Sequence, residues 1–438
     1  MEIILPEEVV TIIAMLEESG HKAYCVGGAV RDSIMGLTPG DWDITTSALP
    51  HETAEIFKNF RTIDTGLKHG TLTVIMNHKP FEVTTFRIDG EYGDNRHPQS
   101  VEFTRDIKND LARRDFTVNA IAYNKAEGIV DLYGGRDDIY NSIIRTVGDP
   151  DKRFEEDGLR IMRALRFSAT LGFEIDEETA KAIHRNKDLL KNISVERISV
   201  ELTKLLCGKN AFNILMEYPD VFSVFIPEIE SAVNFTQYGE KHAYDVWEHI
   251  CHTVDTIPAD KTLRLTMLLH DLGKVPTHKL NEKGDSTFKN HATVGGEMAK
   301  EILTRLKFDK KTINRVSFLV GCHDFEPPET KIDLKHHLKT KTPEDIRTLL
   351  VIKRSDRGAL SEKYRDISEG TAQTLKWLNE IEENNECCTL KELAVTGKDI
   401  TEKGFTGEEV GKTLNMLLDA VIEGKVQNTK SHLLTYLL

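Results

Sequence analysis

Two glycines followed by two aspartates form the first group of residues that could carry out chemistry. Residues 25–45 read CVGGAVRDSIMGLTPGDWDIT, in which a β-prone run leads into Gly28 and Arg31, and Asp41 and Asp43 follow. Glycines at the end of a strand let backbone N–H groups approach a phosphate, and an arginine can bind a phosphate bidentately. Asp41 and Asp43 alternate along a strand and therefore point to one face, where two carboxylates can hold Mg²⁺ together with substrate phosphates.

A third carboxylate could come from Glu82, on the expected strand Phe81–Thr85. Two divalent ions held by such carboxylates can clamp the attacking and leaving oxygens of a phosphoryl transfer. Each feature also has an ordinary interpretation, because a Gly-Gly pair is usually a turn, paired aspartates usually end a solvated strand, and Glu82 is equally well a strand-edge charge. The combination GG-x2-RD-x8-DxD on a strand–turn–helix–strand is far more specific than its parts.

The combined pattern resembles the nucleotidyltransferase superfamily, and specifically the class II tRNA nucleotidyltransferases, the CCA-adding enzymes, which share a head with bacterial poly(A) polymerases. The resemblance implies that Asp41 and Asp43 bind the catalytic Mg²⁺ and that Gly28 and Arg31 contact the triphosphate of CTP or ATP. It also implies a tRNA partner, whose 3′-OH attacks the α-phosphate.

A second group lies in Leu111–Ala120, which reads LARRDFTVNA. It is similar to the family's Arg-Arg-Asp motif, which the resemblance assigns to the ribose and phosphates, and Arg114 and Asp115 are the matching residues. A carboxylate that accepts from a 2′-OH selects ribonucleotides over deoxyribonucleotides. Asn119 lies one helical turn from Asp115, so both could face one pocket. Taken alone, this stretch would favour a helix with ordinary surface charges.

A third group lies on a helix that we expect over Lys152–Leu171, where residues 153–166 read RFEEDGLRIMRALR. On that helix Asp157 and Arg160 are i,i+3 neighbours. The carboxylate can accept from the exocyclic amine of cytosine or adenine, and the guanidinium can donate to a ring nitrogen or carbonyl. The pair can therefore select C and A over G and U.

Arg163 and Arg166 continue the basic stripe of this helix and could reach phosphates. A salt-bridged, solvated helix is the alternative. Residues 156–160 resemble the EDxxR element that serves as the nucleotide template in class II enzymes. Residues 193–202 resemble the next neck motif, which is expected to support the template helix by packing.

Histidines and aspartates in the order H…HD…H…H…D mark a further site. It comprises His249, His270, Asp271, His291, His323 and Asp356. This order resembles the HD superfamily of metal-dependent phosphohydrolases, and imidazoles with carboxylates suit a divalent transition metal or Mg²⁺. His249, His270, Asp271 and Asp356 would hold one metal, and His291 and His323 could complete a second. The alternative is a helical domain that retains polar core residues.

These residues need an α/β scaffold followed by helices. A helix is expected within residues 1–20, and the β-prone runs are Ala23–Val26, Leu72–Met76 and Glu82–Phe86. After residue 150 the sequence has helical periodicity and few strand signals. We therefore predict an α/β nucleotidyltransferase head followed by an all-helical neck, body and tail. The divisions are 1–148 for the head, 149–240 for the neck and start of the body, with the nucleotide template and RNA binding, 241–365 for an HD-type domain, and 366–438 for a tRNA-binding tail.

Composition limits the function classes. The 438 residues carry a net charge of −14, which excludes a globally basic nucleic-acid-binding protein and requires a local basic surface for RNA. No run of 18 apolar residues occurs, so we expect no membrane segment. The six cysteines form no CxxC pair, and the first residues lack a signal-peptide pattern, so reduced thiols in a cytoplasmic protein are expected.

The resemblance covers nearly the whole chain and predicts addition of the 3′-terminal CCA to tRNA from CTP and ATP. An enzyme that adds only the terminal A can share every motif named above. An HD phosphohydrolase whose head only binds RNA is an alternative of a different class. The polar stretch over residues 87–98 resembles the flexible loop that helps the family switch from C to A addition, which argues against an enzyme that adds only CC.

Overall fold

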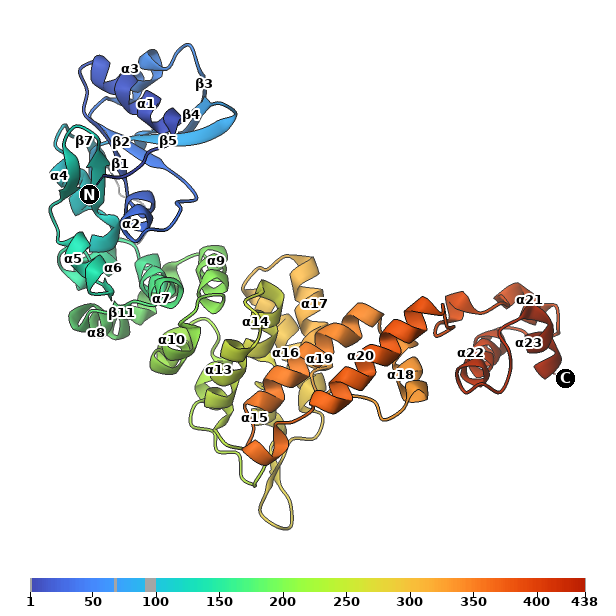
Figure 1. Ribbon diagram of the computed structural model, residues 1–438. Coiled ribbons are helices and arrows are strands. Elements are labelled where there is room, and N and C mark those ends of the chain that lie inside the picture. Colours follow the sequence, from blue (N-terminus) through green and yellow to red (C-terminus); the bar gives the residue numbers. More distant parts are fainter. Residues whose placement is uncertain (1, 67–68, 91–99, 438) are drawn as a thin grey trace. The chain divides into compact units, whose positions relative to one another are not determined.

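The computed structural model describes residues 2–66, 69–90 and 100–437, which divide into two compact units (Figure 1). Unit 1 comprises Met1–Val233, Ala259–Lys261 and Ile302–Asp309, and unit 2 comprises Asn234–Pro258, Thr262–Glu301 and Lys310–Leu438. Unit 1 thus combines the predicted head with most of the predicted neck. The four-part division of the chain stays a prediction.

A late segment of the chain completes the core of unit 1. Ile302, Leu303 and Leu306 are buried there. The hydroxyl of Ser199 donates a hydrogen bond to the carbonyl of Leu306 at 2.7 Å. Unit 1 is therefore built from parts of the chain more than 100 residues apart.

A seven-stranded mixed sheet forms the centre of the head, in the order β3-β4-β5-β2-β1-β8-β9. Its strands are β1 Ala23–Val26, β2 Asp43–Thr46, β3 Arg61–Gly66, β4 Thr71–Met76, β5 Lys79–Thr85, β8 Ile121–Asn124 and β9 Gly128–Asp131. β2 and β5 pair parallel, and the other neighbouring pairs are antiparallel. The predicted strand Ala23–Val26 is confirmed, and the other two predicted strands correspond to β4 and β5.

Short helices surround this sheet. They are α1 Glu7–Glu18, α2 Gly28–Ile34, α3 Pro50–Ile56, α4 Ile107–Ala112 and α5 Gly135–Tyr140, with a 3-10 turn, η2, at Thr117–Asn119. The predicted first helix is confirmed, because α1 buries Val9, Ile12, Ile13 and Leu16. The antiparallel pair β6 Arg87–Asp89 and β7 Val101–Phe103 flanks the predicted loop, of which residues 91–98 lie outside the described residues.

The neck is helical. Its elements are α6 Pro150–Glu156, α7 Leu159–Leu171, α8 Glu177–Asn186, η3 Lys187–Asn192, α9 Val195–Leu206, α10 Ala211–Glu217, α11 Pro219–Phe222 and α12 Glu228–Ala232. The two-residue strands β10 Ile143–Ile144 and β11 Glu174–Ile175 pair parallel.

The single helix predicted over Lys152–Leu171 is wrong. Asp157 is extended, with φ −142°, and separates α6 from α7. Its carboxylate accepts a hydrogen bond from the backbone N–H of Leu159 at 3.1 Å, which supports the start of α7. A Cβ on Gly158 would lie 3.1 Å from the Cβ and carbonyl oxygen of Leu189. Tight packing at this glycine and a local acceptor at Asp157 thus favour a break.

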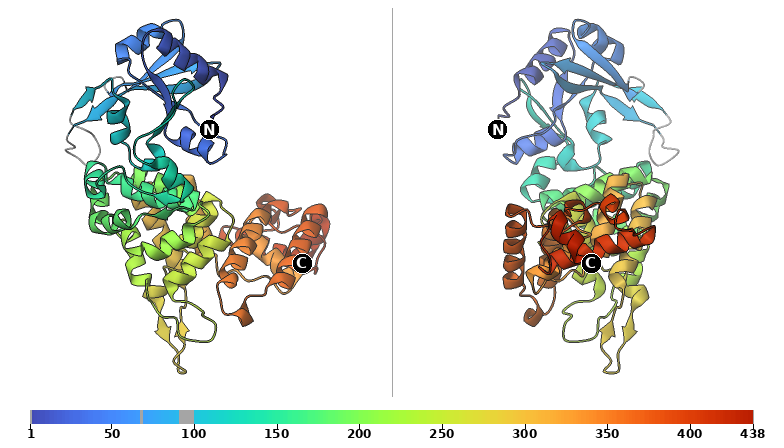
Figure 2. Two further views of the ribbon diagram at one scale, coloured as in Figure 1. Left: turned by 60° about the vertical axis from the view of Figure 1, so that its left-hand side comes forward. Right: turned by 90° about the vertical axis from the view of Figure 1, so that its right-hand side faces the viewer.

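Unit 2 is almost entirely helical. Its helices are α13 Val246–Thr256, α14 Lys261–Leu269, α15 Lys274–Thr277, α16 His291–Arg305, α17 Lys310–Gly321, α18 Lys331–Leu338, α19 Pro343–Gly358, α20 Ser368–Glu383, α21 Gly397–Thr401, α22 Glu408–Ile422 and α23 Lys430–Tyr436, with 3-10 turns η4 Glu362–Tyr364 and η5 Leu390–Glu392. A hairpin of β12 Lys279–Leu280 and β13 Ser286–Thr287 extends beyond the helices of this unit (gold in Figure 2). An α/β head followed by helices confirms the predicted fold class, apart from these short strand pairs.

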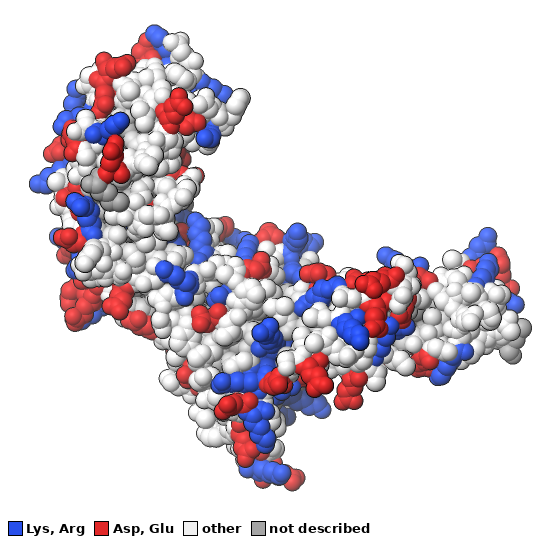
Figure 3. All heavy atoms as spheres, in the orientation of Figure 1, with Lys and Arg blue, Asp and Glu red and all other residues white. Residues whose placement is uncertain are grey.

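The surface and the thiols agree with the composition. On the face that Figure 3 shows, Lys and Arg side chains are interspersed with Asp and Glu. All six cysteines are free thiols. No helix in the described part of the chain is both long and apolar enough to span a bilayer.

Candidate active site and metal cavity

The three predicted catalytic carboxylates lie on or beside two neighbouring strands of unit 1. β2 and β5 run parallel with Ile44 beside Val83, so the preceding residues, Asp43 and Glu82, lie level with one another. Asp41 precedes β2, which begins at Asp43, and so lies just before the strand on which the sequence pattern placed it. The structure therefore brings Asp41, Asp43 and Glu82 into one neighbourhood.

These carboxylates crowd one another electrostatically. Partial desolvation by the surrounding protein raises the pKa of the Asp43 carboxyl group, although Asp43 is exposed at the start of β2. Arg114 opposes this rise, and the charge of Asp41 adds to it. Exclusion of water also raises the pKa of Glu82, and the charges of Asp43 and Asp41 raise it further. A divalent cation would relieve this repulsion, and Mg²⁺ prefers carboxylate oxygens as protein ligands.

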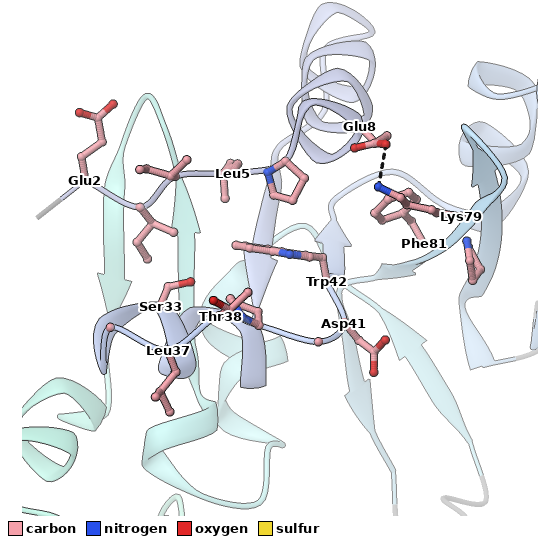
Figure 4. Close-up of a pocket in the computed structure, with 17 residues that line it drawn as sticks. Glu2, Leu5, Glu8, Ser33, Leu37, Thr38, Asp41, Trp42, Lys79 and Phe81 are labelled. Carbon is pink, nitrogen blue, oxygen red and sulfur yellow. Dashed lines mark hydrogen bonds and ion pairs between the residues drawn. The ribbon is translucent and has the colours of Figure 1, made fainter.

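Trp42 lies between the two aspartates in sequence, and its side chain lines a cavity. This cavity, of about 870 Å³, lies between the first residues of the chain, the loop over residues 36–42 and the start of β5. Figure 4 shows the indole of Trp42 between Leu5 and Thr38, whereas the carboxylate of Asp41 points away from them. Trp42 and Asp41 thus point to different sides of this segment.

Gly27 brings an arginine close to the backbone at the start of α2. Its φ of +78° lies in the region that favours glycine, and a Cβ there would lie 3.3 Å from Nη1 of Arg114. Nη2 of Arg114 donates to Oδ2 of Asp110 at 3.3 Å. The buried Nε of Arg114 has no hydrogen-bond acceptor among the described residues, so this donor is available to a ligand.

A chain of hydrogen bonds links the head to α7. Nη1 of Arg31 donates to Oδ1 of Asn119 at 2.6 Å, and Nδ2 of Asn119 donates to Oδ1 of Asp115 at 3.1 Å. Nε of Arg163 donates to Oδ2 of Asp115 at 2.7 Å. Burial favours the neutral form of Asp115, but the charge of Arg163 and the hydrogen bond from Asn119 lower its pKa to about 2. Asp115 is therefore a carboxylate that orders two arginines.

The helical spacing expected for Asp115 and Asn119 is wrong in one detail. Asp115 follows α4, and Asn119 ends the 3-10 turn η2, so the two residues are not one α-helical turn apart on a continuous helix. The backbone N–H of Phe116 also donates to Asp115, at 2.9 Å. The turn still brings both side chains to one place, as expected.

The side chains of Asp157 and Arg160 do not hydrogen-bond to each other in the described contacts, although the backbone N–H of Arg160 donates to the carbonyl of Asp157 at 2.9 Å. Nη1 and Nη2 of Arg197 donate to the two carboxylate oxygens of Asp157, at 3.3 and 2.9 Å. Arg160 is buried, and it is held by Glu156 and by the carbonyls of two other residues. Both predicted template residues are therefore fixed by partners of their own.

The contacts of Arg160 leave one edge of its guanidinium unused. Nη1 donates to the carbonyl of Arg153 at 3.0 Å and to Oε2 of Glu156 at 2.5 Å, and Nη2 donates to the carbonyl of Arg113 at 3.0 Å. The Nε–H and the second Nη2–H have no acceptor among these described contacts. These two donors are therefore available to a ligand.

Helix α9 carries two residues whose role the sequence analysis missed. Arg197 pairs with Asp157, and the buried Glu201, one turn further on, accepts from Nε of Arg166 at 2.9 Å. In the sequence, these two residues stand out only as opposite charges at i,i+4 spacing. Their ion-pair partners, Asp157 and Arg166, lie 40 and 35 residues away. The expected support by packing thus includes two ion pairs.

Comparison with family models and relatives places this chain in a family. A model described as the poly A polymerase head domain matches residues 23–145, one described as the probable RNA and SrmB-binding site of polymerase A matches residues 172–233, and one described as tRNA nucleotidyltransferase domain 2, putative, matches residues 288–437. The CCA-adding enzyme of Geobacillus sp. (strain WCH70) is 36% identical over 440 residues, which cover 98% of this chain and 95% of that enzyme. This chain belongs to the CCA-adding enzyme family.

Solved structures of CCA-adding enzymes share its fold. The crystal structure of the Bacillus stearothermophilus CCA-adding enzyme in complex with CTP matches 99% of this chain and 97% of that one, with 31% identity and a TM-score of 0.72. The Thermotoga maritima CCA-adding enzyme complexed with tRNA-CCA matches 100% and 96%, with 20% identity and a TM-score of 0.62, which shows a common fold. The family predicted from the sequence is confirmed.

Unit 2 of this CCA-adding family member brings the six predicted HD-type residues into one cluster, of which Asp271, His291, His323 and Asp356 line a cavity. Nε2 of His249 lies 3.2 Å from Oδ2 of Asp271 and 3.1 Å from Oδ1 of Asp356. Nε2 of His270 lies 3.3 Å from Oδ2 of Asp271. The four residues offer ligand atoms within 4.8 Å of one another.

A second set shares one residue with the first. Nε2 of His291 and Nε2 of His323 lie 3.1 Å apart, and each lies 3.5 Å from Oδ1 of Asp271. Asp271 thus offers Oδ2 to one set and Oδ1 to the other. Among the described residues, sets of three or more such ligand atoms within 4.8 Å occur in this cavity and not at Asp41, Asp43 and Glu82.

Backbone carbonyls orient the imidazoles of this cavity. Nδ1 of His270, His291 and His323 lies 2.7, 2.8 and 2.7 Å from the carbonyl oxygens of Met267, Phe288 and Val320, respectively. A proton on Nδ1 leaves the Nε2 lone pair for a metal, and such a second partner is usual for metal-bound histidine. The ring positions therefore fit metal ligation.

Buried polar atoms without partners support the same interpretation. Nε2 of His270 and Oδ1 of Asp271 have no hydrogen-bond partner among the described residues. Burial disfavours a charged His270, yet Asp271 and Asp356 raise its pKa to about 10. The carboxylates thus favour positive charge at this point, which a divalent cation would supply.

Two buried lysines complete the cavity, whose volume is about 450 Å³. Nζ of Lys274 lies 2.6 Å from Oδ2 of Asp271 and donates to Oε1 of Gln237 at 2.8 Å. Nζ of Lys353 lies 2.9 Å from Oε1 of Glu326. Cationic side chains beside a metal site are suited to an anionic ligand such as a phosphate.

Proposed function

We propose that this protein adds the 3′-terminal CCA to tRNA, from CTP and ATP and without a nucleic-acid template. The tRNA 3′-OH attacks the α-phosphate of the bound nucleotide, and pyrophosphate leaves. The observation that carries this proposal is the joint presence of the paired carboxylates and the ordered arginines in unit 1 of a chain that matches a CCA-adding enzyme over 95% of that enzyme's length.

Asp41 and Asp43, with Glu82 beside them, would hold catalytic Mg²⁺. Their mutual repulsion and their carboxylate oxygens fit such an ion. When bound, Mg²⁺ would polarise the phosphate and neutralise charge that develops during the transfer. The protein contributes the fixed positions of the carboxylates, through the parallel pairing of β2 with β5.

Arginines would bind the triphosphate. Arg31, Arg163 and Arg166 are held by Asn119, Asp115 and Glu201. Arg114, whose Nη1 lies beside Gly27, keeps a buried Nε donor without an acceptor among the described residues. Asp115 already accepts from three donors, so its contribution to ribose selection would combine direct contact with the ordering of Arg163.

Asp157 and Arg160 would select the base. Arg160 keeps two N–H donors without an acceptor, at Nε and Nη2, and the Oδ2 atom of Asp157 accepts from a single donor, Arg197, among the described contacts. One acceptor and a pair of donors fit the Watson–Crick edges of cytosine and adenine. Guanine and uracil would leave these buried groups unpaired.

The deciding experiment measures incorporation of CTP and ATP on tRNA that lacks CCA, CA or A. We expect both nucleotides to be added in order to the first substrate, and ATP alone to the third. Addition of ATP only, and only to tRNA ending in CC, would show instead an A-adding enzyme. Absence of addition on all three substrates by folded protein would reject the proposal.

A second activity is favoured by the unit 2 cavity. We propose that His249, His270, Asp271 and Asp356 hold a divalent metal, that His291 and His323 complete a second site, and that the cavity hydrolyses a phosphate ester. Metal analysis of the purified protein and hydrolysis of bis-p-nitrophenyl phosphate with added Mn²⁺, Ni²⁺ or Mg²⁺ test this proposal. Protein that binds none of these metals after dialysis against them would reject it.

A further inference from the structure

One aromatic ring lies beneath three arginines of unit 1. The guanidinium carbons of Arg166, Arg31 and Arg163 lie 3.5, 5.1 and 5.3 Å from the centre of the Phe167 ring. Arg31 comes from α2, whereas the other two share α7 with Phe167. A guanidinium within about 6 Å of a ring centre is attracted by its π face. A single side chain thus contacts basic groups from the head and the neck.

Burial and a contact with Phe116 fix the position of the Phe167 ring. Phe167 is 5% exposed, and Phe116 packs edge-on against it with centroids 5.7 Å apart. Phe167 is the residue after Arg166 on α7, so the ring and that guanidinium belong to adjacent residues of one helix. The ring therefore gives the three arginines a fixed surface.

Like charges would otherwise drive these arginines apart. Three carboxylates each hold one of them, since Asp32 lies 2.7 Å from Nη2 of Arg31, Asp115 pairs with Arg163 and Glu201 pairs with Arg166. Burial lowers the pKa of Arg166, and the charge of Arg163 lowers it further, although Glu201 opposes both effects. Each of the three arginines is thus held beside the ring by a carboxylate of its own.

We propose that Phe167 is a positioning residue that holds Arg31, Arg163 and Arg166 as one seat for the triphosphate of the incoming nucleotide. This inference rests on the proposed nucleotide addition and deepens it. Phe167 acts through the arginines and does not touch the base. It should therefore affect CTP and ATP equally and leave base selection unchanged.

The test compares Phe167→Leu, which removes the π face but keeps an apolar side chain, with Phe167→Tyr, which keeps the ring. Phe173→Leu is the matched control, because Phe173 is also buried, lies two residues after the end of α7 and makes no cation–π contact among the described residues. Titration calorimetry with Mg²⁺ gives the Kd of CTP, pyrophosphate and cytidine without tRNA, and steady-state assays give KM and kcat.

We expect Phe167→Leu to weaken CTP and pyrophosphate by the same factor, about five- to tenfold, and to leave cytidine binding unchanged. The KM values of CTP and ATP should rise together while kcat and the preference for CTP over UTP change less than twofold. Phe167→Tyr should restore binding to within about twofold of the unaltered protein. Phe173→Leu should change none of these values.

Three results would overturn the inference: CTP and pyrophosphate binding within twofold of normal in folded Phe167→Leu, equal losses in the Leu and Tyr variants, or equal losses in Phe173→Leu. If Phe167→Leu does not fold, Phe167→Met replaces it. Failure of both to fold, with Phe173→Leu intact, would identify a core residue and reject the positioning role. If the variants show that CTP binding depends on Phe167, but the unaltered protein adds no nucleotide to tRNA, the proposed function would be rejected instead.

Discussion

Arg197 donates hydrogen bonds to both carboxylate oxygens of Asp157, with N···O distances of 3.3 and 2.9 Å. The pair joins α9 to the break between α6 and α7. Because the fork of the guanidinium occupies one side of the carboxylate, Asp157 has a fixed direction before any nucleotide binds. Arg197 is therefore expected to act on base selection without contacting the base.

Replacing Arg197 with alanine should loosen base selection. Loss of a hydrogen-bonded charge pair costs about 1.5–3 kcal/mol, so we expect use of CTP and ATP to fall roughly 10- to 100-fold and UTP to compete. Arg197→Lys keeps the charge but not the bidentate fork and should be intermediate. A four-nucleotide competition on tRNA lacking CCA measures this effect. Unchanged selectivity in folded Arg197→Ala would contradict the role.

Arg160→Ala should remove the donors to the base itself. A good bidentate contact contributes about 1–3 kcal/mol of discrimination, so GTP and UTP should compete with CTP and ATP by a corresponding factor. The same competition assay applies, with Arg136→Ala as control, because Arg136 is an exposed arginine on α5. If Arg160→Ala keeps full selectivity at an unchanged rate, base selection must lie elsewhere.

Asp41→Ala and Asp43→Ala should each abolish addition of both nucleotides while tRNA binding survives. Several kcal/mol of transition-state stabilisation by bound metal correspond to a loss of about a thousandfold or more. Single-turnover incorporation and a filter-binding assay with tRNA measure the two properties. Glu55→Ala, which breaks an exposed ion pair with Lys58, serves as control. Turnover within tenfold of normal in either aspartate variant would be incompatible with the assigned role.

The unit 2 cavity should be separable from nucleotide addition. The double variant His270→Ala/Asp271→Ala removes a ligand of each proposed metal site, so bound metal and phosphate-ester hydrolysis should be lost while CCA addition continues. Metal analysis, hydrolysis and incorporation are measured on the same preparation. His252→Ala, on α13 but outside the ligand sets, should retain its metal. Loss of addition in the folded double variant would show that the two activities are coupled.

Gly158→Ala should destabilise unit 1. The added Cβ would meet Leu189 at 3.1 Å and Ile193 at 3.3 Å, and overpacking of this kind costs about 1–3 kcal/mol. Gly411→Ala is the control, since that helical glycine on α22 has nothing within 4 Å, and the change should raise stability by up to about 1 kcal/mol. Chemical denaturation measures both variants. Equal stabilities would show that the packing at Gly158 relaxes freely.

Local patterns predicted much of this structure because they depend on neighbours in sequence. A short β-prone run predicted the strand Ala23–Val26, and apolar residues at 3–4 spacing predicted the helix that begins after Pro6. The histidines and aspartates of unit 2 were found because their order along the chain is specific. Each of these signals lies within a short stretch or a recognisable motif.

Long-range partners could not be predicted in the same way. The break at Asp157 interrupts a pattern that reads as one helix, and it depends on Leu189 and Arg197, which lie more than 30 residues away. The ion pair of Arg166 with Glu201 likewise joins two helices whose pairing no local rule specifies. The candidate site residues could therefore be predicted from the sequence, whereas their hydrogen-bond and packing partners could be identified only from the folded structure.

The return of residues 302–309 to unit 1 determines how this protein can be divided. A fragment ending at Val233 would lack Leu303 and Leu306, and the apolar surface they cover would face water. The hydroxyl of Ser199 would also lose its acceptor. The transferase half is consequently not a detachable module, and a deletion that removes the metal cavity must leave this eight-residue segment in place if the remainder is to fold.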